Sequence, residues 1–295
     1  MNYATFNKFY FFILVFSVSF TEAVADKPIL IMTHSYNRPD FIEIQYKTFK
    51  AFLTDPYEFV VFNDAPDSAT CNKIDDTCMK YGIRSIRIPQ SIHRAPYLFR
   101  LPGEDYNHPC VRCANVVQYS LDTVGFKHDG LVMIIDSDMF LIEQFSLQEY
   151  LSNYDLAGVP QSRQHVNYLW NGLLFFNMNS LPDKTSLNFN CGQVDGIPVD
   201  VGGHTYDYLS THPETRVKLI GHMLIPEGYV LFEEEGMPKN VRFLLEQGMC
   251  NIEFLIRYTF LHYRSGANWD YKPLQYHQTK TQILESFIKS ILPQD

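Results

Sequence analysis

The stretch LVMIIDSD, residues 131–138, decides the fold class of this 295-residue chain. Five consecutive apolar residues are typical of a strand buried on both faces of a parallel sheet, and two aspartates follow at once. Asp136 and Asp138 cannot both face the core, and two adjacent carboxylates repel each other unless a cation offsets the charge. Oxygen ligands at a strand end suit Mg²⁺ or Mn²⁺. We therefore predict a divalent metal site here, and the alternative is a solvated turn that carries two aspartates.

Apolar strands and amphipathic helices alternate upstream of this stretch. We expect strands at 28–33, 58–62, 84–88 and 131–135, and helices at 40–53, near 68–81 and from Pro109 onward. Such alternation implies right-handed crossovers and a mostly parallel sheet, whose ligands bind at the carboxyl ends of the strands. The predicted fold class is α/β, with a mixed, mostly parallel sheet flanked by helices in a single large domain.

The second half of the chain has a more mixed pattern. Strand-like runs occur at 155–160, 171–177, 217–224 and 257–263, between loops that contain Gly, Asn and Pro. At the end, apolar residues with helical spacing predict an amphipathic helix over 278–292, within a C-terminal segment 277–295. We expect this helix to dock on the body of the protein, and the alternative is a helix that binds a membrane surface or a partner.

Residues 1–25 resemble a targeting segment. Lys8 precedes an uncharged apolar run at 9–20, and Ala-Val-Ala at 23–25 has the small-x-small pattern of a cleavage site. The run is shorter than the roughly 20 apolar residues that a membrane-spanning helix needs. We expect a cleaved signal peptide, with a signal anchor or a buried N-terminal helix as alternatives.

Composition and charge exclude two classes of protein. Apolar residues make up 46% and charged residues 19%, so the chain can form a sizeable core and is not intrinsically disordered. The 24 Lys and Arg residues against 33 Asp and Glu residues give a net charge of −9. Nucleic-acid binding needs a basic surface, so we expect no nucleic-acid partner.

Six cysteines permit disulfides if the chain is exported. Cys71 and Cys78 lie on one predicted helix, about 10 Å apart, which is too far for a disulfide. Cys110 and Cys113 form a C-x-x-C pair of the redox or zinc kind, but the sequence has no second pair to complete a zinc site. We favour the interpretation that both are small residues on the buried face of a helix.

Other residues occur in an order that fits the metal motif. The loop HSYNRP (34–39) follows the first strand, Asp64 follows the second, and Arg112 and Asn115 share a helical face. Downstream lie WNGLLFFN (170–177) and FLHYRSG (260–266). In the order and spacing of these motifs, residues 28 to about 272 resemble the GT-A fold, nucleotide-sugar-dependent glycosyltransferases that carry a D-x-D motif.

The resemblance implies roles for particular residues. Asp136, Asp138 and His262 would bind Mn²⁺ or Mg²⁺. The residues implied in donor binding are His34, Tyr36, Arg38, Asp64, Arg112, Asn115, Ser137, Asn171, Gly172, Ser265 and Gly266. Some members have a lysine six residues after the late histidine, where this chain has Asn268, and Arg264 or Arg112 could replace it.

The resemblance also implies an activity and a division of the chain. Residues 26–276 would form the transferase domain, with a nucleotide-binding half at 28–140 and an acceptor half at 141–276. The donor would be a nucleotide-sugar, with a UDP-sugar favoured, and the acceptor a hydroxyl group on a glycan, a protein or a lipid. The sequence leaves open the donor sugar and whether the enzyme inverts or retains the anomeric configuration.

An inverting enzyme needs a carboxylate that accepts the proton of the acceptor hydroxyl. Asp200 is the first candidate, because the VDVGG stretch around it contains glycines that allow close approach of a substrate. Asp207 and the run 233–235 are alternatives, although three consecutive glutamates are more typical of a solvated loop.

A signal peptide on such an enzyme restricts its compartment. Nucleotide-sugars occur in the cytosol and in the ER and Golgi lumen, so we expect a place in the secretory pathway or export into a host cell. The N-terminal segment would also permit membrane association.

Three other functions compete. A secreted, catalytically inactive sugar- or nucleotide-binding protein could keep the same fold. A nucleotidyltransferase would need a glycine-rich loop after the first strand, and HSYNR at 34–38 has no glycine. A phosphatase of the haloacid-dehalogenase type usually opens its domain with D-x-D, whereas three predicted strands precede it here.

Overall fold

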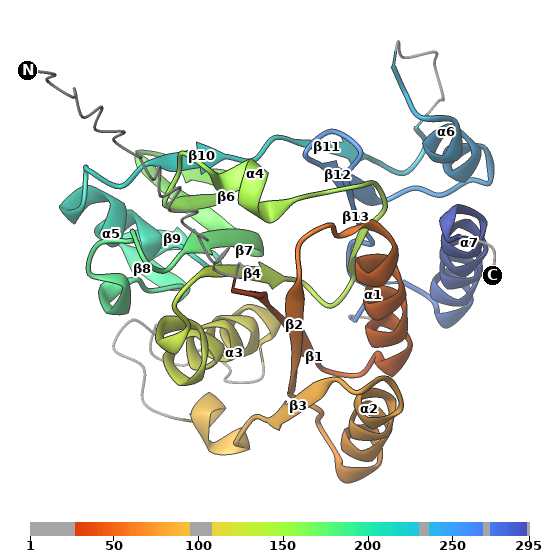
Figure 1. Ribbon diagram of the computed structural model, residues 1–295, viewed down its shortest axis with the longest axis horizontal. Coiled ribbons are helices and arrows are strands. Elements are labelled where there is room, and N and C mark those ends of the chain that lie inside the picture. Colours follow the sequence, from red (N-terminus) through yellow and green to blue (C-terminus); the bar gives the residue numbers. More distant parts are fainter. Residues whose placement is uncertain (1–26, 95–107, 230–235, 268–271, 294–295) are drawn as a thin grey trace, which may run out of the picture.

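The computed structural model describes residues 27–94, 108–229, 236–267 and 272–293 (Figure 1). The expected signal peptide, the glutamate run 233–235 and Asn268 lie outside the described residues. No helix in the described part of the chain is long and apolar enough to cross a membrane.

The centre of the molecule is a seven-stranded sheet with the order β10-β6-β7-β4-β1-β2-β3. Its strands are β1 (Ile29–Ser35), β2 (Tyr57–Asn63), β3 (Arg84–Arg87), β4 (Leu131–Ile135), β6 (Leu156–Arg163), β7 (Val166–Asn177) and β10 (Val217–Leu219). β7 runs antiparallel to both of its neighbours, and every other pairing in the sheet is parallel. This confirms the predicted mixed, mostly parallel sheet.

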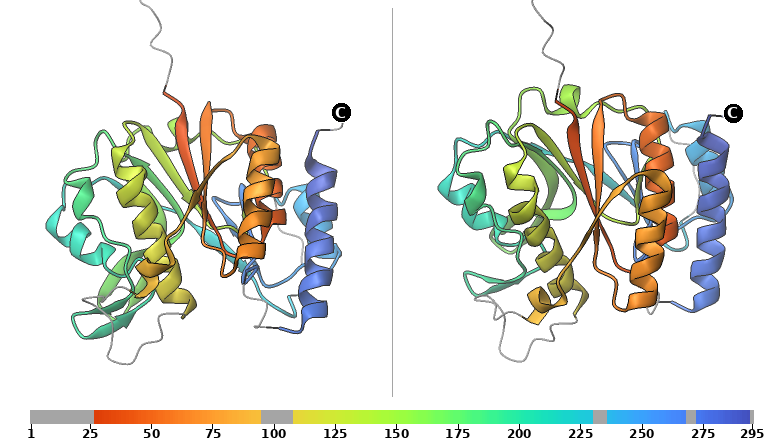
Figure 2. Two further views of the ribbon diagram at one scale, coloured as in Figure 1. Left: turned by 90° about the horizontal axis from the view of Figure 1, so that it is seen from below. Right: turned by 60° about the horizontal axis from the view of Figure 1, so that its bottom comes forward.

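Helices cover both faces of this sheet (Figure 2). They are α1 (Pro39–Phe52), α2 (Ser68–Tyr81), α3 (Pro109–Thr123), α4 (Leu147–Leu151) and α5 (Thr205–Thr211). α1, α2 and α4 pack on the face that carries Ile29 and Ile31, whereas α3 and α5 pack on the face that carries Leu30 and Met32. Successive strand residues point to opposite faces, so the apolar side chains at the first four positions of β1 fill both layers.

Local signals fix the ends of these helices. Pro39 stands at the start of α1, and the Asp67 carboxylate accepts from the Thr70 amide at the start of α2. Gly82 ends α2 in the left-handed conformation, with φ of 66°. The predicted bounds of α2 and β4 are therefore confirmed.

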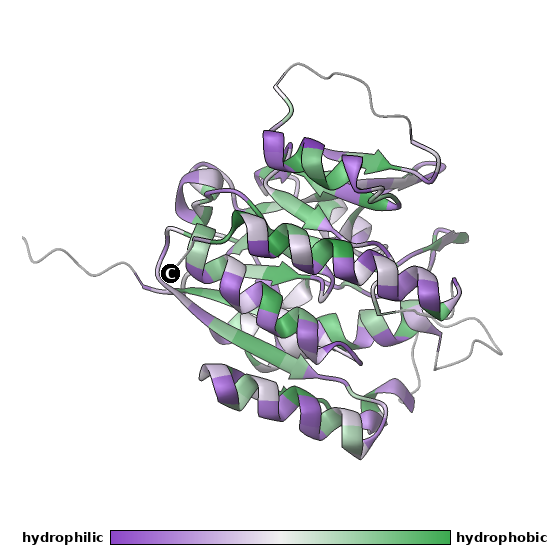
Figure 3. Cartoon of the chain, turned by 90° about the vertical axis from the view of Figure 1, so that its right-hand side faces the viewer, coloured by the Kyte–Doolittle hydropathy of each residue, from purple (hydrophilic) through white to green (hydrophobic). Residues whose placement is uncertain are grey.

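A second, four-stranded antiparallel sheet adjoins the first. It has the order β11-β12-β13-β5, formed by β11 (His222–Ile225), β12 (Ile252–Leu255), β13 (Phe260–His262) and β5 (Met139–Leu141). α6 (Lys239–Glu246) and α7 (Leu274–Ile291) pack with this sheet and α1 around a separate apolar cluster. Seen from this side, the outer helices carry mixed polar and apolar residues (Figure 3). A small hairpin, β8 (Gly192–Val194) with β9 (Ile197–Val199), completes the described strands.

The predictions for the second half need correction. The run 217–224 is not one strand, because β10 and β11 belong to different sheets. The run 257–263 contributes only β13, since Ile256 and Arg257 adopt positive φ angles in a turn. β5 and β12 were not predicted, because strands of three or four residues are too short to show a period. The C-terminal helix was predicted, but it begins at Leu274.

Candidate functional site

The turn between β4 and β5 brings together three side chains that could bind a metal ion. Asp136 and Asp138 lie in this turn, and His262 ends β13, which pairs with β5. One ligand atom from each residue lies within 4.8 Å of the others, and His262 Nε2 is 3.4 Å from Asp138 Oδ1. Residues more than 120 positions apart in the sequence thus form one cluster, named here the acidic triad.

Gln45, a buried residue of α1, binds the backbone of this turn. The Gln45 side-chain amide donates to the carbonyl oxygens of Asp136 and Met139, at 2.8 and 3.0 Å. The Asp136 amide donates to the Gly172 carbonyl at 2.8 Å, and the Tyr263 amide donates to the Asp138 carbonyl at 2.8 Å. Because the backbone of the turn is fixed on several sides, the two carboxylates are preorganised rather than free to separate.

Gly266 closes one side of the triad. Its amide donates to Asp138 Oδ2 at 2.7 Å. A Cβ at position 266 would lie 2.6 Å from Asp138 Cβ and 2.7 Å from a ring carbon of Phe41, so only glycine fits. Arg38 and Asn37 hold this segment through the carbonyls of Gly266 and Ala267, at 2.9 and 3.1 Å.

Glu253 supports His262 from the neighbouring strand. The two residues are opposite each other in the β12–β13 pairing, and His262 Nδ1 lies 2.9 Å from Glu253 Oε2. A histidine held in this way at Nδ1 presents Nε2 to a metal ion. The sequence analysis missed Glu253, because only the strand register places it beside the histidine.

The charges within the triad and its burial shift the pKa values of all three residues. Burial and the Asp138 carboxylate raise the pKa of Asp136 to about 7. Burial alone would keep His262 neutral, but Asp138 and Glu253 outweigh it and raise the pKa of His262 to about 10. Burial also opposes ionisation of Asp138, yet His262 and the Gly266 amide lower its pKa.

The donor set of the triad fits a divalent cation. Two carboxylate oxygens and one imidazole nitrogen suit Mn²⁺ or Mg²⁺, with Mn²⁺ the better match for the nitrogen. A bound cation would remove the repulsion that raises the pKa of Asp136. It would also replace the proton of His262 as the positive partner of Asp138.

A second polar cluster lies at the carboxyl end of β2. Asp64 is only 4% exposed, and its carboxylate is 2.8 Å from both Arg112 and His93. Gln90 donates to Asp64 at 2.9 Å and accepts from Arg112 at 3.1 Å, and Asn115 lies 3.4 Å from His93. The structure brings together three residues implied in donor binding, and it adds Gln90 and His93, which the sequence analysis missed.

Side chains of the same chain already pair with the Asp64 carboxylate. Burial opposes ionisation, but His93 and Arg112 outweigh it and lower the pKa of Asp64. Contact between Asp64 and a nucleotide base stays a prediction.

The predicted loop 34–39 is shorter than expected, because β1 runs to Ser35 and so includes His34. His34 Nε2 lies 3.0 Å from the Ser120 hydroxyl, and burial lowers the pKa of His34 to about 4. The Tyr36 ring lies under the guanidinium of Arg112, at 5.1 Å. Arg38 is 4% exposed and pairs with Asp40 at 2.6 Å, in addition to the Gly266 carbonyl. Arg38 therefore positions the segment beside Asp138, and a direct contact with a donor stays a prediction.

The start of the WNGLL stretch lies against the triad. The indole of Trp170 is 5.2 Å from the His262 ring. A Cβ on Gly172 would lie 2.0 Å from that indole, so glycine is needed for the ring to pack here. Buried Asn171 donates to Cys113 Sγ at 3.1 Å. Ser137 is half-buried within the turn, and Ser265 has a positive φ of 62° next to Gly266.

The two candidate bases have different surroundings. Asp200 is half-buried, and its Oδ1 accepts from the Cys110 thiol at 3.1 Å and from the Val201 amide at 2.8 Å. Burial, and then the charges of Asp136, Asp200 and Asp138, raise the pKa of Cys113. Asp207 is mostly exposed on α5 and pairs with His204 at 3.0 Å.

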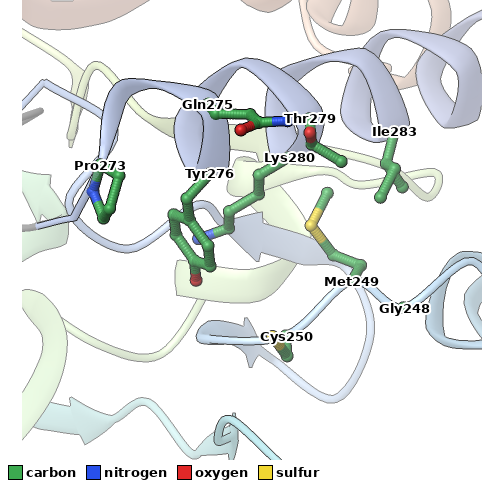
Figure 4. A pocket seen from close by; sticks show the side chains of 9 residues that line it. All are labelled: Gly248, Met249, Cys250, Pro273, Gln275, Tyr276, Thr279, Lys280 and Ile283. Atoms are coloured by element: carbon green, nitrogen blue, oxygen red, sulfur yellow. The ribbon is translucent and has the colours of Figure 1, made fainter.

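A separate hollow of about 420 Å³ lies beneath α7 (Figure 4). Tyr276 and Lys280 project from α7 toward the segment that carries Met249 and Cys250. The Lys280 ammonium donates to the carbonyls of Asn251 and Arg264, at 2.9 and 3.3 Å. Lys280 thereby ties α7 to the segment that follows His262.

Comparisons with known proteins give matches in structure alone. No family model and no curated protein matches the sequence. Solved structures that match include galactosyltransferase LgtC in complex with donor and acceptor sugar analogs, with 11% identity and a TM-score of 0.44 over 90% of this chain and 97% of LgtC. A second is mannosyltransferase PcManGT from Pyrobaculum calidifontis in complex with GDP-Man and Mn²⁺, with 12% identity and a TM-score of 0.42 over 76% of this chain and 62% of the enzyme. A third is core-mannan synthase A from Aspergillus fumigatus in an Mn/GDP form, with 8% identity and a TM-score of 0.36 over 52% of this chain and 60% of the synthase.

These three proteins are glycosyltransferases, and this chain spans less than two thirds of the length of the latter two. At TM-scores below 0.5 the likeness carries no weight for function. The case for an activity therefore rests on the residues of the site.

Proposed function

We propose that this chain is a glycosyltransferase that moves a sugar from a nucleotide-diphosphate donor to a hydroxyl group of a glycan, protein or lipid. The observation that carries the proposal is the acidic triad at the carboxyl end of β4, in the middle of a mostly parallel sheet. Ligand sites of such sheets lie at this edge. A divalent cation bound there would stabilise the negative charge that develops on the diphosphate leaving group.

The residues of the chain would orient the donor. The Asp64–Arg112 cluster lies at the end of β2 and Tyr36 follows β1, and in the sheet order β1 lies beside β4 and β2 lies beside β1. These groups supply a guanidinium and an aromatic ring at the same edge as the triad, which suits a nucleoside diphosphate. A UDP-sugar is our first choice of donor.

The charge balance favours a bound ligand over a purely structural role. Two carboxylates at the triad face one imidazole, and a buried carboxylate without full compensation destabilises the ligand-free fold. A solvated turn, the alternative considered from sequence, would leave both aspartates exposed, whereas Asp138 is only 7% exposed.

The proposal is tested by calorimetric titration of UDP into the purified chain, with and without Mn²⁺. We expect binding that requires Mn²⁺ and is lost in Asp138→Asn. GDP is titrated in the same way, because the base contact is the least constrained part of the site. Absence of binding by either nucleotide under any metal condition would exclude the transferase. Binding without hydrolysis or transfer of any nucleotide-sugar would instead support a catalytically inactive binding protein.

The role of Asp200 as a general base has a matched control in the same region. We expect Asp200→Asn to lower kcat about 100-fold or more, in line with the usual contribution of a general base, and to leave the UDP affinity unchanged. Asp207→Asn makes the same chemical change on an exposed side chain and should leave kcat unchanged. Equal rates for Asp200→Asn and the wild type would remove Asp200 from the mechanism, and a loss of kcat in Asp207→Asn instead would make Asp207 the base. Unchanged rates in both variants would favour a retaining enzyme.

A further inference from the structure

We propose that Cys110 and Cys191 form a disulfide bond that joins the first turn of α3 to the segment before β8. The two cysteines are far apart in the sequence, but their thiols are hydrogen-bonded in the folded chain. Cys191 belongs to one apolar cluster with Val111, Ala114 and Val201, and both Cys110 and Cys113 pack against that cluster. The proposal concerns a site outside the acidic triad and does not depend on the glycosyltransferase activity.

Backbone hydrogen bonds hold the two segments that carry these cysteines. On the α3 side, the Cys110 amide donates to the ring of His108, which caps the helix, at 3.3 Å. On the other side, the carbonyls of Phe189 and Asn190 accept from Gly202 and His204, at 2.8 and 3.3 Å. A disulfide requires its two cysteines close together and suitably directed, and a native contact between thiols on two anchored segments meets the first requirement without unfolding.

Cys113 is the competing partner for Cys110, because the two form a C-x-x-C pair. Its Sγ accepts a hydrogen bond from Asn171 at 3.1 Å, so it is directed toward β7. Cys110 instead contacts Asp200 and Cys191. The geometry therefore favours Cys191 as the partner of Cys110. Cys110 and Cys113 are both half-buried and pack against an apolar cluster, which agrees with the expectation that they lie on the inner face of a helix.

The oxidation is a thiol–disulfide exchange with a small-molecule disulfide such as glutathione disulfide. The thiolate of one cysteine attacks the oxidant to give a mixed disulfide, and the second cysteine then displaces glutathione. One Sγ–Sγ bond forms, the two protein thiols lose two protons and two electrons, and the oxidant is reduced to two thiols. The hydrogen that Cys110 donates to Asp200 is lost in the process, so Asp200 keeps the Val201 amide as its donor.

Trypsin separates the three cysteines, which makes the test direct. Cleavage after Arg100, Arg112, Lys127, Lys184 and Arg216 yields peptides 101–112 with Cys110, 113–127 with Cys113 and 185–216 with Cys191. The purified full chain is oxidised with glutathione disulfide at pH 8.5, its remaining thiols are alkylated, and it is digested without reduction. We expect peptide 101–112 linked to peptide 185–216, with the mass of the sum less two hydrogens.

Two variants serve as controls. Cys113→Ser should keep the linked peptide, and Cys191→Ser should lose it. Cys78 lies on the buried side of α2 and is 1% exposed, so we expect it to stay a thiol. A link between peptides 101–112 and 113–127, glutathione adducts without a crosslink, or alkylation of both Cys110 and Cys191 would each overturn the proposal.

Discussion

Asp136 and Asp155 are both held in the folded chain, one after β4 and the other before β6, but their surroundings differ in kind. Asp155 receives hydrogen bonds from the Arg216 guanidinium at 2.6 and 3.0 Å, from the Ser180 hydroxyl at 2.6 Å and from the Arg216 amide at 2.9 Å. The hydrogen bonds from Arg216 and Ser180 lower the pKa of Asp155 to about 2. Asp136 has a second carboxylate beside it instead, and burial together with Asp138 raises its pKa to about 7.

The difference separates a structural carboxylate from one suited to binding. An excess of donors around Asp155 stabilises the charged form, so this residue contributes to the fold. At the triad, burial and the neighbouring Asp138 carboxylate destabilise the charged form of Asp136 and leave a site that a cation would complete. Substitutions at the two sites should therefore change stability in opposite directions.

The largest effect is expected for Asp136→Asn. Loss of a carboxylate ligand should weaken Mn²⁺ binding by about 100-fold or more, beyond the 10- to 100-fold typical of a supporting residue. Without metal, the thermal midpoint should stay the same or rise, because the repulsion with Asp138 disappears. Mn²⁺ affinity is measured by calorimetry and the midpoint by differential scanning calorimetry. A lower midpoint without metal would show that the triad stabilises the fold as Asp155 does.

A smaller effect is expected for Glu253→Ala. The Nδ1 of His262 loses its partner at 2.9 Å, so the ring is no longer fixed with Nε2 toward the triad. We expect Mn²⁺ affinity to fall about 10-fold. Glu253→Gln retains an oxygen that can accept from His262 and should recover most of the affinity. If both variants bind Mn²⁺ like the wild type, Glu253 does not position the histidine.

The smallest effect on binding, and the clearest on stability, is expected for Asp155→Asn. Mn²⁺ affinity should not change. Since Arg216 is 57% exposed and solvent screens the pair, we expect the free energy of unfolding to fall by about 1–2 kcal/mol at pH 7. Urea denaturation of the variant and the wild type measures the difference.

The interaction of Asp155 with Arg216 also predicts how the free energy of unfolding changes with pH. The pKa of Asp155 is lower in the folded chain than in the unfolded chain, so its contribution is full above about pH 4. It is lost as the pH falls from about 4 toward 2. The difference in stability between wild type and Asp155→Asn should therefore shrink over this window. A constant difference would mean that the contribution of Asp155 does not depend on its charge.

Sequence patterns were sufficient where the elements are long and regular. Five buried residues before Asp136 and the capping signals of α2 locate β4 and α2 without further information. The patterns did not predict β5 and β12 of the antiparallel sheet, which have three and four residues, and they gave only approximate bounds for β13. Such strands are defined by their hydrogen-bonding partners, and those partners lie far away in the sequence.

The residues of the candidate site also differ in whether the sequence could predict them. Asp136 and Asp138 stand out in the sequence, because two carboxylates directly after five apolar residues repel each other unless a cation offsets their charge. His262 could be named only through a resemblance, and Glu253, Gln90 and His93 could not be named, because nothing nearby in the sequence marks them. A side-chain contact depends on the register of strands and on how loops fold back over the sheet edge.

The sequence by itself determined that the chain forms a mixed, mostly parallel α/β sheet with two aspartates at the carboxyl end of a central strand. Only the tertiary structure decided what surrounds those aspartates. It placed His262 and Gly266 beside Asp138, gave Arg38 a positioning role, and brought Cys110 against Cys191. The physical reason is range: periodicity and capping act within one helix or strand, whereas the pKa of a buried group depends on every charge and donor that the fold brings near it.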